Sequence, residues 1–144
     1  MWLSEVKVIN FPKIEDARGN LSFLENCKQI PFKIARTYWI YDVPGGEERG
    51  SHAFRSMQEV IIALSGSFDV KLHDGNGEKK YSLNRSYYGL YVPSLLWRSL
   101  ENFSTNSLAL IVSDTLYSED EYIRDFAEFQ ILKRKIEDEH NSRL

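Results

Sequence analysis

The sequence contains one cysteine, Cys27, among 144 residues, so it cannot form an internal disulfide. Its apolar runs are much shorter than the ~18 residues that a membrane-spanning helix needs. No long run of Lys or Arg is present, and the net charge of −3 argues against non-specific binding to nucleic acid. These absences predict a cytoplasmic protein that binds neither membranes nor nucleic acid.

The chain length suits one domain with a sizeable core. We expect residues 1–139 to form this domain and residues 140–144 to be a frayed C-terminal tail. The first residues, MWLSEVKVINF, mix polar and apolar positions, which predicts a strand and not a signal peptide.

Short segments rich in β-branched and aromatic residues recur along most of the chain. Strands are predicted at 6–11, 21–24, 32–43, 59–64, 68–72, 79–83, 87–92, 95–100 and 108–113, with a further strand through His52. Segment 21–24 is expected to complete a hairpin-like pair with 6–11. Many short strands at regular spacing are typical of a β-sandwich or barrel.

The hydrophobic period changes from two to that of a helix after Ser118. Ser118 is a suitable N-cap, and Glu121 stands at the capping-box position. Tyr122, Phe126 and Phe129 then follow at helical spacing. This pattern predicts a C-terminal amphipathic helix of roughly four to five turns, packed on the sheet or on a partner subunit.

Two predicted strands carry polar side chains on faces that a barrel would enclose. His52 and Phe54 share one face of their strand, and an enclosed histidine can transfer protons near neutral pH. Arg36 and Tyr38 share a face of the strand 32–43. This second pair either holds an anionic or sugar-like ligand, or consists of a core tyrosine and an arginine that extends to solvent.

The spacing of several residues resembles the two motifs of the cupins, which implies a double-stranded β-helix (jelly roll). The first motif is matched by Gly46, His52, Phe54, Glu59 and Gly66, and the second by Pro93, Arg98 and Asn102. In metal cupins three histidines and the glutamate bind one ion. Here Phe54 and Arg98 replace two of the histidines. Phenylalanine offers no lone pair and guanidinium is a permanent cation, so we expect no metal.

Longer pieces resemble a metal-free cupin subfamily, the WxcM/FdtA/QdtA-like sugar-nucleotide 3,4-ketoisomerases with an RmlC-like jelly roll. The matching pieces are 16–21, 30–40, 49–53, 62–70, 89–93, Trp97 and 117–124. The resemblance implies an isomerase that moves the keto group of dTDP-4-keto-6-deoxy-D-glucose from C4 to C3 through an enediol. The product would serve 3-amino-deoxysugars of surface polysaccharide, such as the O-antigen of lipopolysaccharide. It also implies a homodimer that uses no cofactor.

The expected chemistry assigns roles to individual residues. His52 is the predicted base and proton shuttle, and Tyr38 would relay a proton to or from the sugar oxygens. Arg98 or Arg18 would stabilise the enediolate. The residues expected to bind substrate are Arg36, Arg49, Ser51, Phe54, Gln58, Tyr91 and Trp97.

One departure from the family pattern leaves the activity open. The family usually has His-Ala-His where this chain has His52-Ala53-Phe54. We expect an active enzyme, with His52 as its base. The alternatives are a non-catalytic cupin that binds a sugar nucleotide, or a 3,5-epimerase that acts on the same substrate.

Overall fold

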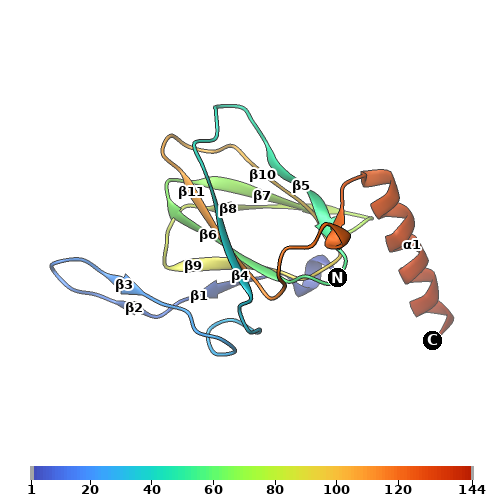
Figure 1. Ribbon diagram of the computed structural model, residues 1–144, viewed down its shortest axis with the longest axis horizontal. Coiled ribbons are helices and arrows are strands. Elements are labelled where there is room, and N and C mark those ends of the chain that lie inside the picture. The colour runs from blue at the N-terminus through green and yellow to red at the C-terminus, as the bar shows by residue number, and fades with distance from the viewer. Residues whose placement is uncertain (1, 144) are drawn as a thin grey trace.

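Two antiparallel sheets form the body of the computed structural model, which describes residues 2–143 (Figure 1). The first sheet has the order β1 (Lys7–Asn10), β9 (Tyr88–Val92), β6 (Glu59–Ser65), β11 (Leu108–Ser113) and β4 (Arg36–Tyr41). The second has the order β12 (Tyr122–Ile123), β5 (Arg49–Phe54), β10 (Trp97–Glu101), β7 (Phe68–His73) and β8 (Glu78–Leu83). The predicted all-β fold with a C-terminal helix is confirmed.

The main core lies between these sheets and explains the alternation along their strands. On β7, Phe68, Val70 and Leu72 are buried, whereas Asp69 and Lys71 on the opposite face are not. The side chains that meet them from other strands are Ile61, Ala63, Leu83, Leu90, Val92, Leu100, Ala109 and Ile111. Each fully buried Val, Leu, Ile or Phe side chain of this core stabilises the fold by roughly 1.5–3 kcal/mol.

The N-terminal strands pair differently from the prediction. β1 lies antiparallel to β9, with Lys7 opposite Tyr91, instead of pairing with residues 21–24. The latter contribute β3 (Leu21–Ser22), which pairs with β2 (Lys13–Ile14) in a small separate hairpin. This hairpin extends away from the body, on the side opposite the C-terminal helix (Figure 1).

The predicted helix start is wrong, because Glu121 contacts a neighbouring turn instead of capping a helix. Its carboxylate accepts hydrogen bonds from the backbone N–H groups of Ser56 (2.9 Å) and Met57 (2.8 Å) and from the Ser56 hydroxyl (2.7 Å). Residues Glu119–Glu121 form a 3-10 turn that leads into β12. A second 3-10 turn, Leu3–Glu5, precedes β1.

Helix α1 (Phe126–Ser142) begins after Asp125, whose carboxylate accepts a hydrogen bond from the Ala127 N–H at 3.1 Å. Since α1 continues through Ser142, residues 140–142 of the predicted tail are helical, and Leu144 lies outside the described residues. The buried Phe129 packs this helix against the end of the second sheet. Among residues 2–143, no helix is both long and apolar enough to cross a membrane.

Candidate active site

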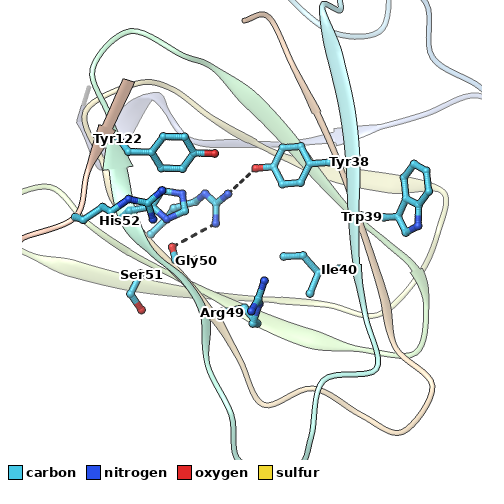
Figure 2. Close-up of a pocket in the computed structure, with 10 residues that line it drawn as sticks. Tyr38, Trp39, Ile40, Arg49, Gly50, Ser51, His52 and Tyr122 are labelled. Carbon is cyan, nitrogen blue, oxygen red and sulfur yellow. Dashed lines mark hydrogen bonds between the residues drawn. The ribbon is translucent and has the colours of Figure 1, made fainter. Parts of the chain in front are cut away.

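A cavity of about 400 Å³ opens where β4 faces β5, β10 and β12 (Figure 2). Its lining consists of Tyr38, Trp39, Ile40, Arg49, Gly50, Ser51, His52, Arg98, Tyr122 and Arg124. The structure therefore brings together five residues that the sequence predicted for the site: His52, Tyr38, Arg98, Arg49 and Ser51.

A buried ion pair forms one side of this pocket. The side chains of Arg98 and Glu59 are each 1% exposed, and the Arg98 Nε contacts Glu59 Oε1. The Arg98 Nη2 donates to the Tyr38 hydroxyl at 2.8 Å and to Glu59 Oε2 at 3.3 Å, and Nη1 donates to the Gly50 carbonyl at 3.4 Å. Burial by itself lowers the pKa of Arg98, but Glu59 and Tyr38 raise this pKa above its ordinary value. The guanidinium is therefore a fixed positive charge.

Tyr38 is the third member of this ion-pair network. Its hydroxyl donates to Glu59 Oε2 at 3.0 Å while accepting from Arg98. Burial and then the negative charge of Glu59 raise the pKa of Tyr38 well above its ordinary value. The phenol thus stays protonated, with its proton directed to Glu59.

His52 lies next to this network but takes no part in it. The residue is 8% exposed, and its buried Nε2 has no hydrogen-bond partner among residues 2–143. Burial, followed by the charges of Arg98 and Arg124, lowers the pKa of His52 to about 3. The imidazole is therefore neutral at physiological pH and able to accept a proton.

Phe54 packs behind His52 instead of lining the cavity. Its ring centroid lies 4.7 Å from that of His52 and 4.9 Å from that of Tyr122, with the Arg98 guanidinium 5.4 Å away. The position at which the family usually has a second histidine is therefore filled by an apolar ring that is 4% exposed. It shapes the surroundings of His52 and carries no proton.

Gly50 allows Arg98 to reach this position. Its backbone has φ +69°, and a Cβ atom there would overlap with Arg98 Nη1. The register between β5 and β10 shifts just after the pairing of Arg98 with His52, a local irregularity often found at binding sites.

Arg18 does not reach the pocket of its own chain. It lies in the turn between β2 and β3, where its side chain is 91% exposed and pairs with Asp16 at 3.0 Å. Arg36 also lies outside the lining, behind Tyr38, with its guanidinium 4.7 Å from the Tyr38 ring centroid and 5.4 Å from that of Tyr117. The Arg36 Nε is buried without a hydrogen-bond partner among the described residues.

Three other predicted substrate contacts are absent from this pocket. Trp97 points away from Arg98 because neighbouring residues of a strand face opposite sides, and it packs against Phe126 at 5.3 Å. Gln58 donates to Asp114 at 2.9 Å and accepts a hydrogen bond from the Tyr91 hydroxyl.

Five lining residues were not predicted for the site: Trp39, Ile40, Gly50, Tyr122 and Arg124. Tyr122 and Arg124 were missed because segment 118–124 was interpreted as a helix start. Its resemblance to the family was the one available indication that it belongs to the site. The residues 2–143 contain no group of three or more His, Cys, Asp or Glu side chains placed to hold a metal ion. The carboxylate of Glu59, the remaining acidic residue of the cupin motif, is paired with Arg98.

The two sheets and their enclosed histidine define a cupin-like jelly roll. The fold is similar to that of dTDP-4-dehydrorhamnose 3,5-epimerase from Bacillus anthracis, with a TM-score of 0.73 at 17% identity over 83% of this chain and 77% of the other. This low identity shows the fold alone. Residues 4–134 match the family described as "FdtA: WxcM-like, C-terminal". The chain belongs to this family, which confirms the sequence-based prediction.

Three relatives that are at least 32% identical to the chain are 3,4-ketoisomerases. The chain is 40% identical to the TDP-4-oxo-6-deoxy-alpha-D-glucose-3,4-oxoisomerase of Aneurinibacillus thermoaerophilus over 92% of this chain and 95% of the relative. A 3,4-ketoisomerase from Helicobacter canadensis has a TM-score of 0.88 at 40% identity, over 90% and 98% of the two chains. A variant of QdtA from Thermoanaerobacterium thermosaccharolyticum, in complex with TDP-4-keto-6-deoxyglucose, has a TM-score of 0.90 at 32% identity, over 93% and 97%.

Proposed function

We propose that this protein is a 3,4-ketoisomerase that moves the keto group of dTDP-4-keto-6-deoxy-D-glucose from C4 to C3. The observation that carries the proposal is a neutral histidine with an unpaired Nε2, buried beside the charged Arg98 in one pocket. The activities of the relatives support the same reaction.

His52 is the base that removes the proton from C3 and returns a proton to C4. The free enzyme keeps its imidazole neutral, so the lone pair needed for proton abstraction is available at pH 7. The anionic substrate would bring negative charge close to Arg98 and Arg124, which would offset their effect and raise the pKa of His52. The imidazole would then be a stronger base in the complex than in the free enzyme.

Arg98 stabilises the negative charge that develops on the sugar oxygen in the enediolate. Its guanidinium is already held by Glu59, Tyr38 and the Gly50 carbonyl, so little reorganisation accompanies the reaction. Such fixed electrostatic stabilisation is worth about 3–4 kcal/mol in known enzymes. Tyr38 positions this guanidinium and contacts the sugar, while Arg49 and Ser51 at the pocket rim, together with Arg124, bind the diphosphate.

We further propose that the protein acts as a homodimer. The outer face of the first sheet exposes a set of apolar side chains, and a hollow of about 390 Å³ is lined by Trp39, Tyr41, Leu64, Leu108 and Leu110. The β2–β3 hairpin exposes Ile14 and Leu21, and a two-stranded hairpin is marginally stable by itself. Docking these two apolar surfaces in a symmetric pair of chains would remove both from water.

Such a dimer would give Arg18 a role in catalysis. Trp39 borders both the apolar hollow and the pocket, so a hairpin docked on the outer face would end near the pocket of the second copy. Arg18 would then stabilise the enediolate in that pocket, together with Arg98.

Complementation between two inactive variants tests this arrangement. Arg18→Ala and His52→Asn should each abolish most activity alone. After the two chains are unfolded and refolded together, mixed dimers should contain one intact pocket and restore about one quarter of the wild-type rate. No restoration, or a monomer in light scattering, would contradict the shared site.

The isomerase activity itself is tested by incubating the protein with dTDP-4-keto-6-deoxyglucose in deuterated water and following the sugar by NMR. A carbonyl signal that moves from C4 to C3 is the expected result. Deuterium exchange at C5 with inversion would indicate a 3,5-epimerase instead. Binding without exchange would indicate a non-catalytic protein, which the replacement of the second histidine by Phe54 makes a specific alternative.

The product, a nucleotide-linked 3-keto sugar, is suited to amination at C3. We propose that it supplies 3-amino-deoxysugars of surface polysaccharide, such as O-antigen, and that the protein works in the cytoplasm without metal or cofactor. Deletion of the gene should remove the 3-amino sugar from the purified polysaccharide. Sugar analysis of the polysaccharide from the deletion strain measures this directly.

A further inference from the structure

The proposed isomerisation moves two protons, and the pocket has one residue for each. His52 moves a proton from C3 to C4. The second proton passes from the C3 oxygen to the C4 oxygen, because the carbonyl and hydroxyl groups change places. Tyr38, predicted from the sequence to relay a proton to or from the sugar oxygens, has a hydroxyl that can both donate and accept in this second transfer.

Glu59 leaves Tyr38 free to act as this relay. In the free protein the Tyr38 hydroxyl donates to Glu59 Oε2 at 3.0 Å. When the hydroxyl turns to a sugar oxygen, Arg98 still contacts both oxygens of Glu59, since its Nε lies against Oε1 and its Nη2 donates to Oε2 at 3.3 Å. The buried carboxylate therefore keeps a partner throughout the transfer.

A relay through Tyr38 passes through a phenolate, which most of the surroundings disfavour. Burial and then the negative charge of Glu59 raise the pKa of Tyr38, and Tyr122 acts in the same direction, whereas Arg98 lowers this pKa. The charge of Arg98 is already balanced by Glu59. The ion pair therefore brings no net positive charge to the phenolate.

Arg36 places a further positive charge against the Tyr38 ring. The two residues share a face of β4, and the Arg36 guanidinium lies over the Tyr38 ring, 4.7 Å from its centroid. The same guanidinium is 5.4 Å from the centroid of the Tyr117 ring. Its Nη2 contacts Met57 Sδ at 3.8 Å, and its Nε is buried without a hydrogen-bond partner among residues 2–143.

No carboxylate within residues 2–143 neutralises Arg36. Glu59 is paired with Arg98, and Glu119 is paired with Arg124 at 3.1 Å. A guanidinium is a permanent cation, and a partly buried charge without a counter-charge lowers the stability of a fold. The charge of Arg36 therefore has no purpose in stabilising the free protein.

We propose that Arg36 is a positioning residue that acts through Tyr38, by stabilising the phenolate during the proton relay; this rests on the proposed function. A cation over an aromatic ring is attracted to the electrons of the ring. This attraction strengthens when the ring gains a negative charge. Arg36 thus favours the reacting state over the starting state, which is what accelerates a reaction.

The relay returns both proton carriers to their starting states. As His52 takes the C3 proton, the C3–H electrons form the C3–C4 double bond, and the carbonyl electrons move to the C4 oxygen, which takes the phenol proton of Tyr38. The phenolate then takes the proton of the C3 hydroxyl, and the electrons of that O–H bond form the C3 carbonyl. The electrons of the double bond take the proton on His52 to C4. No further reactant is needed.

Substitution of Arg36 by methionine tests the proposal, because it removes the charge and keeps a long side chain beside the ring. In Arg36→Met, kcat should fall about 10–30-fold. The affinity for dTDP and the thermal unfolding should stay as in the wild type, because Arg36 does not line the pocket. Arg36→Lys keeps the charge and should retain most of the turnover. Arg134→Met, on the exposed face of α1, is the control and should retain full turnover.

A double-mutant cycle shows whether Arg36 acts through Tyr38. Tyr38→Phe removes the hydroxyl, so no phenolate forms. Adding Arg36→Met to Tyr38→Phe should then change the residual rate by less than about twofold. A further loss of 10–30-fold in the double variant would overturn the proposal.

A more acidic phenol should compensate for the lost charge. Fluorotyrosine introduced at position 38 keeps the hydroxyl and forms a phenolate more readily than tyrosine. It should raise kcat in Arg36→Met by a larger factor than in the wild-type background. Equal factors in the two backgrounds would contradict stabilisation of the phenolate by Arg36.

The remaining outcomes separate this role from others. Rates are expressed per dTDP-binding site, so that a variant that folds incompletely is still compared correctly, and Arg36→Gln provides a second uncharged side chain. A loss of dTDP affinity as large as the loss of turnover would show that Arg36 binds the substrate directly, and turnover within twofold of the wild type would show no role. Either result would overturn the proposal. Failure of the wild type to convert the substrate would instead reject the proposed function.

Discussion

Arg98 and His52 lie directly opposite each other on β10 and β5, yet their surroundings differ completely. On one side of the pocket, the Arg98 guanidinium is bonded to Glu59, Tyr38 and Gly50. On the other side, His52 is surrounded by the rings of Phe54 and Tyr122 and its Nε2 is unpaired.

This difference indicates that the paired Arg98 meets a requirement of stability, whereas the unpaired His52 meets a requirement of the reaction. A buried charge must be paired or it destabilises the fold, and Glu59 meets this need for Arg98. A buried polar atom without a partner costs about 1–3 kcal/mol, and the protein accepts this cost at His52. The unpaired atom is therefore the one that we expect to meet the substrate.

The largest expected effect comes from removing the unpaired group. His52→Asn should lower turnover about 10³–10⁴-fold, since the proton acceptor is lost. The free energy of unfolding should change by about 1 kcal/mol or less, because the buried amide of asparagine replaces an imidazole whose Nε2 is already unpaired. NMR assays and chemical denaturation measure the two quantities. His140→Asn, on the exposed end of α1, is the control, and His52→Asn with full activity would reject the base assignment.

On the Arg98 side of the pocket, the main expected effect of a substitution is on stability. Glu59→Gln leaves Arg98 without its counter-charge in a buried site, so the free energy of unfolding should fall by about 3 kcal/mol. Glu48→Gln removes an exposed carboxylate 3.9 Å from Lys71 and should change stability by less than about 0.5 kcal/mol. Equal losses of unfolding free energy in the two variants would show that the buried ion pair contributes no more to stability than an exposed one.

The sequence alone predicted some residues of the pocket and missed others. The resemblance to the two cupin motifs identified His52 and Arg98. Alternation along β10 places Trp97 outside the pocket, which its position next to Arg98 in the sequence already required. Tyr122 was missed because Ser118 to Glu121 matches a helix cap, and only tertiary contacts to Ser56 and Met57 select the strand instead.

The approach of Arg98 to β5 gives a smaller but specific effect. Gly50→Ala introduces a Cβ that overlaps with Arg98 Nη1 in a backbone conformation, φ +69°, that disfavours alanine. Unfolding free energy should fall by about 2 kcal/mol, and turnover should fall because the guanidinium moves. In Gly77→Ala the new Cβ has no neighbour within 4 Å, so this control should unfold like the wild type.

The smallest expected effect is a pH dependence of the free energy of unfolding, which distinguishes the neutral His52 from a histidine of ordinary pKa. The folded chain keeps this imidazole unprotonated down to a pKa of about 3, whereas the unfolded chain takes up a proton near pH 6.5. Stability from this group is therefore complete above about pH 6.5 and is lost as the pH falls toward 3, by up to about 1.4 kcal/mol per pH unit. Between pH 6.5 and 5.5 the wild type should lose about 1 kcal/mol more than His52→Asn, as measured by urea unfolding at each pH. A parallel pH dependence of the two proteins would mean that His52 takes up its proton at the same pH in the folded and unfolded chains, which would contradict the lowered pKa of the buried imidazole.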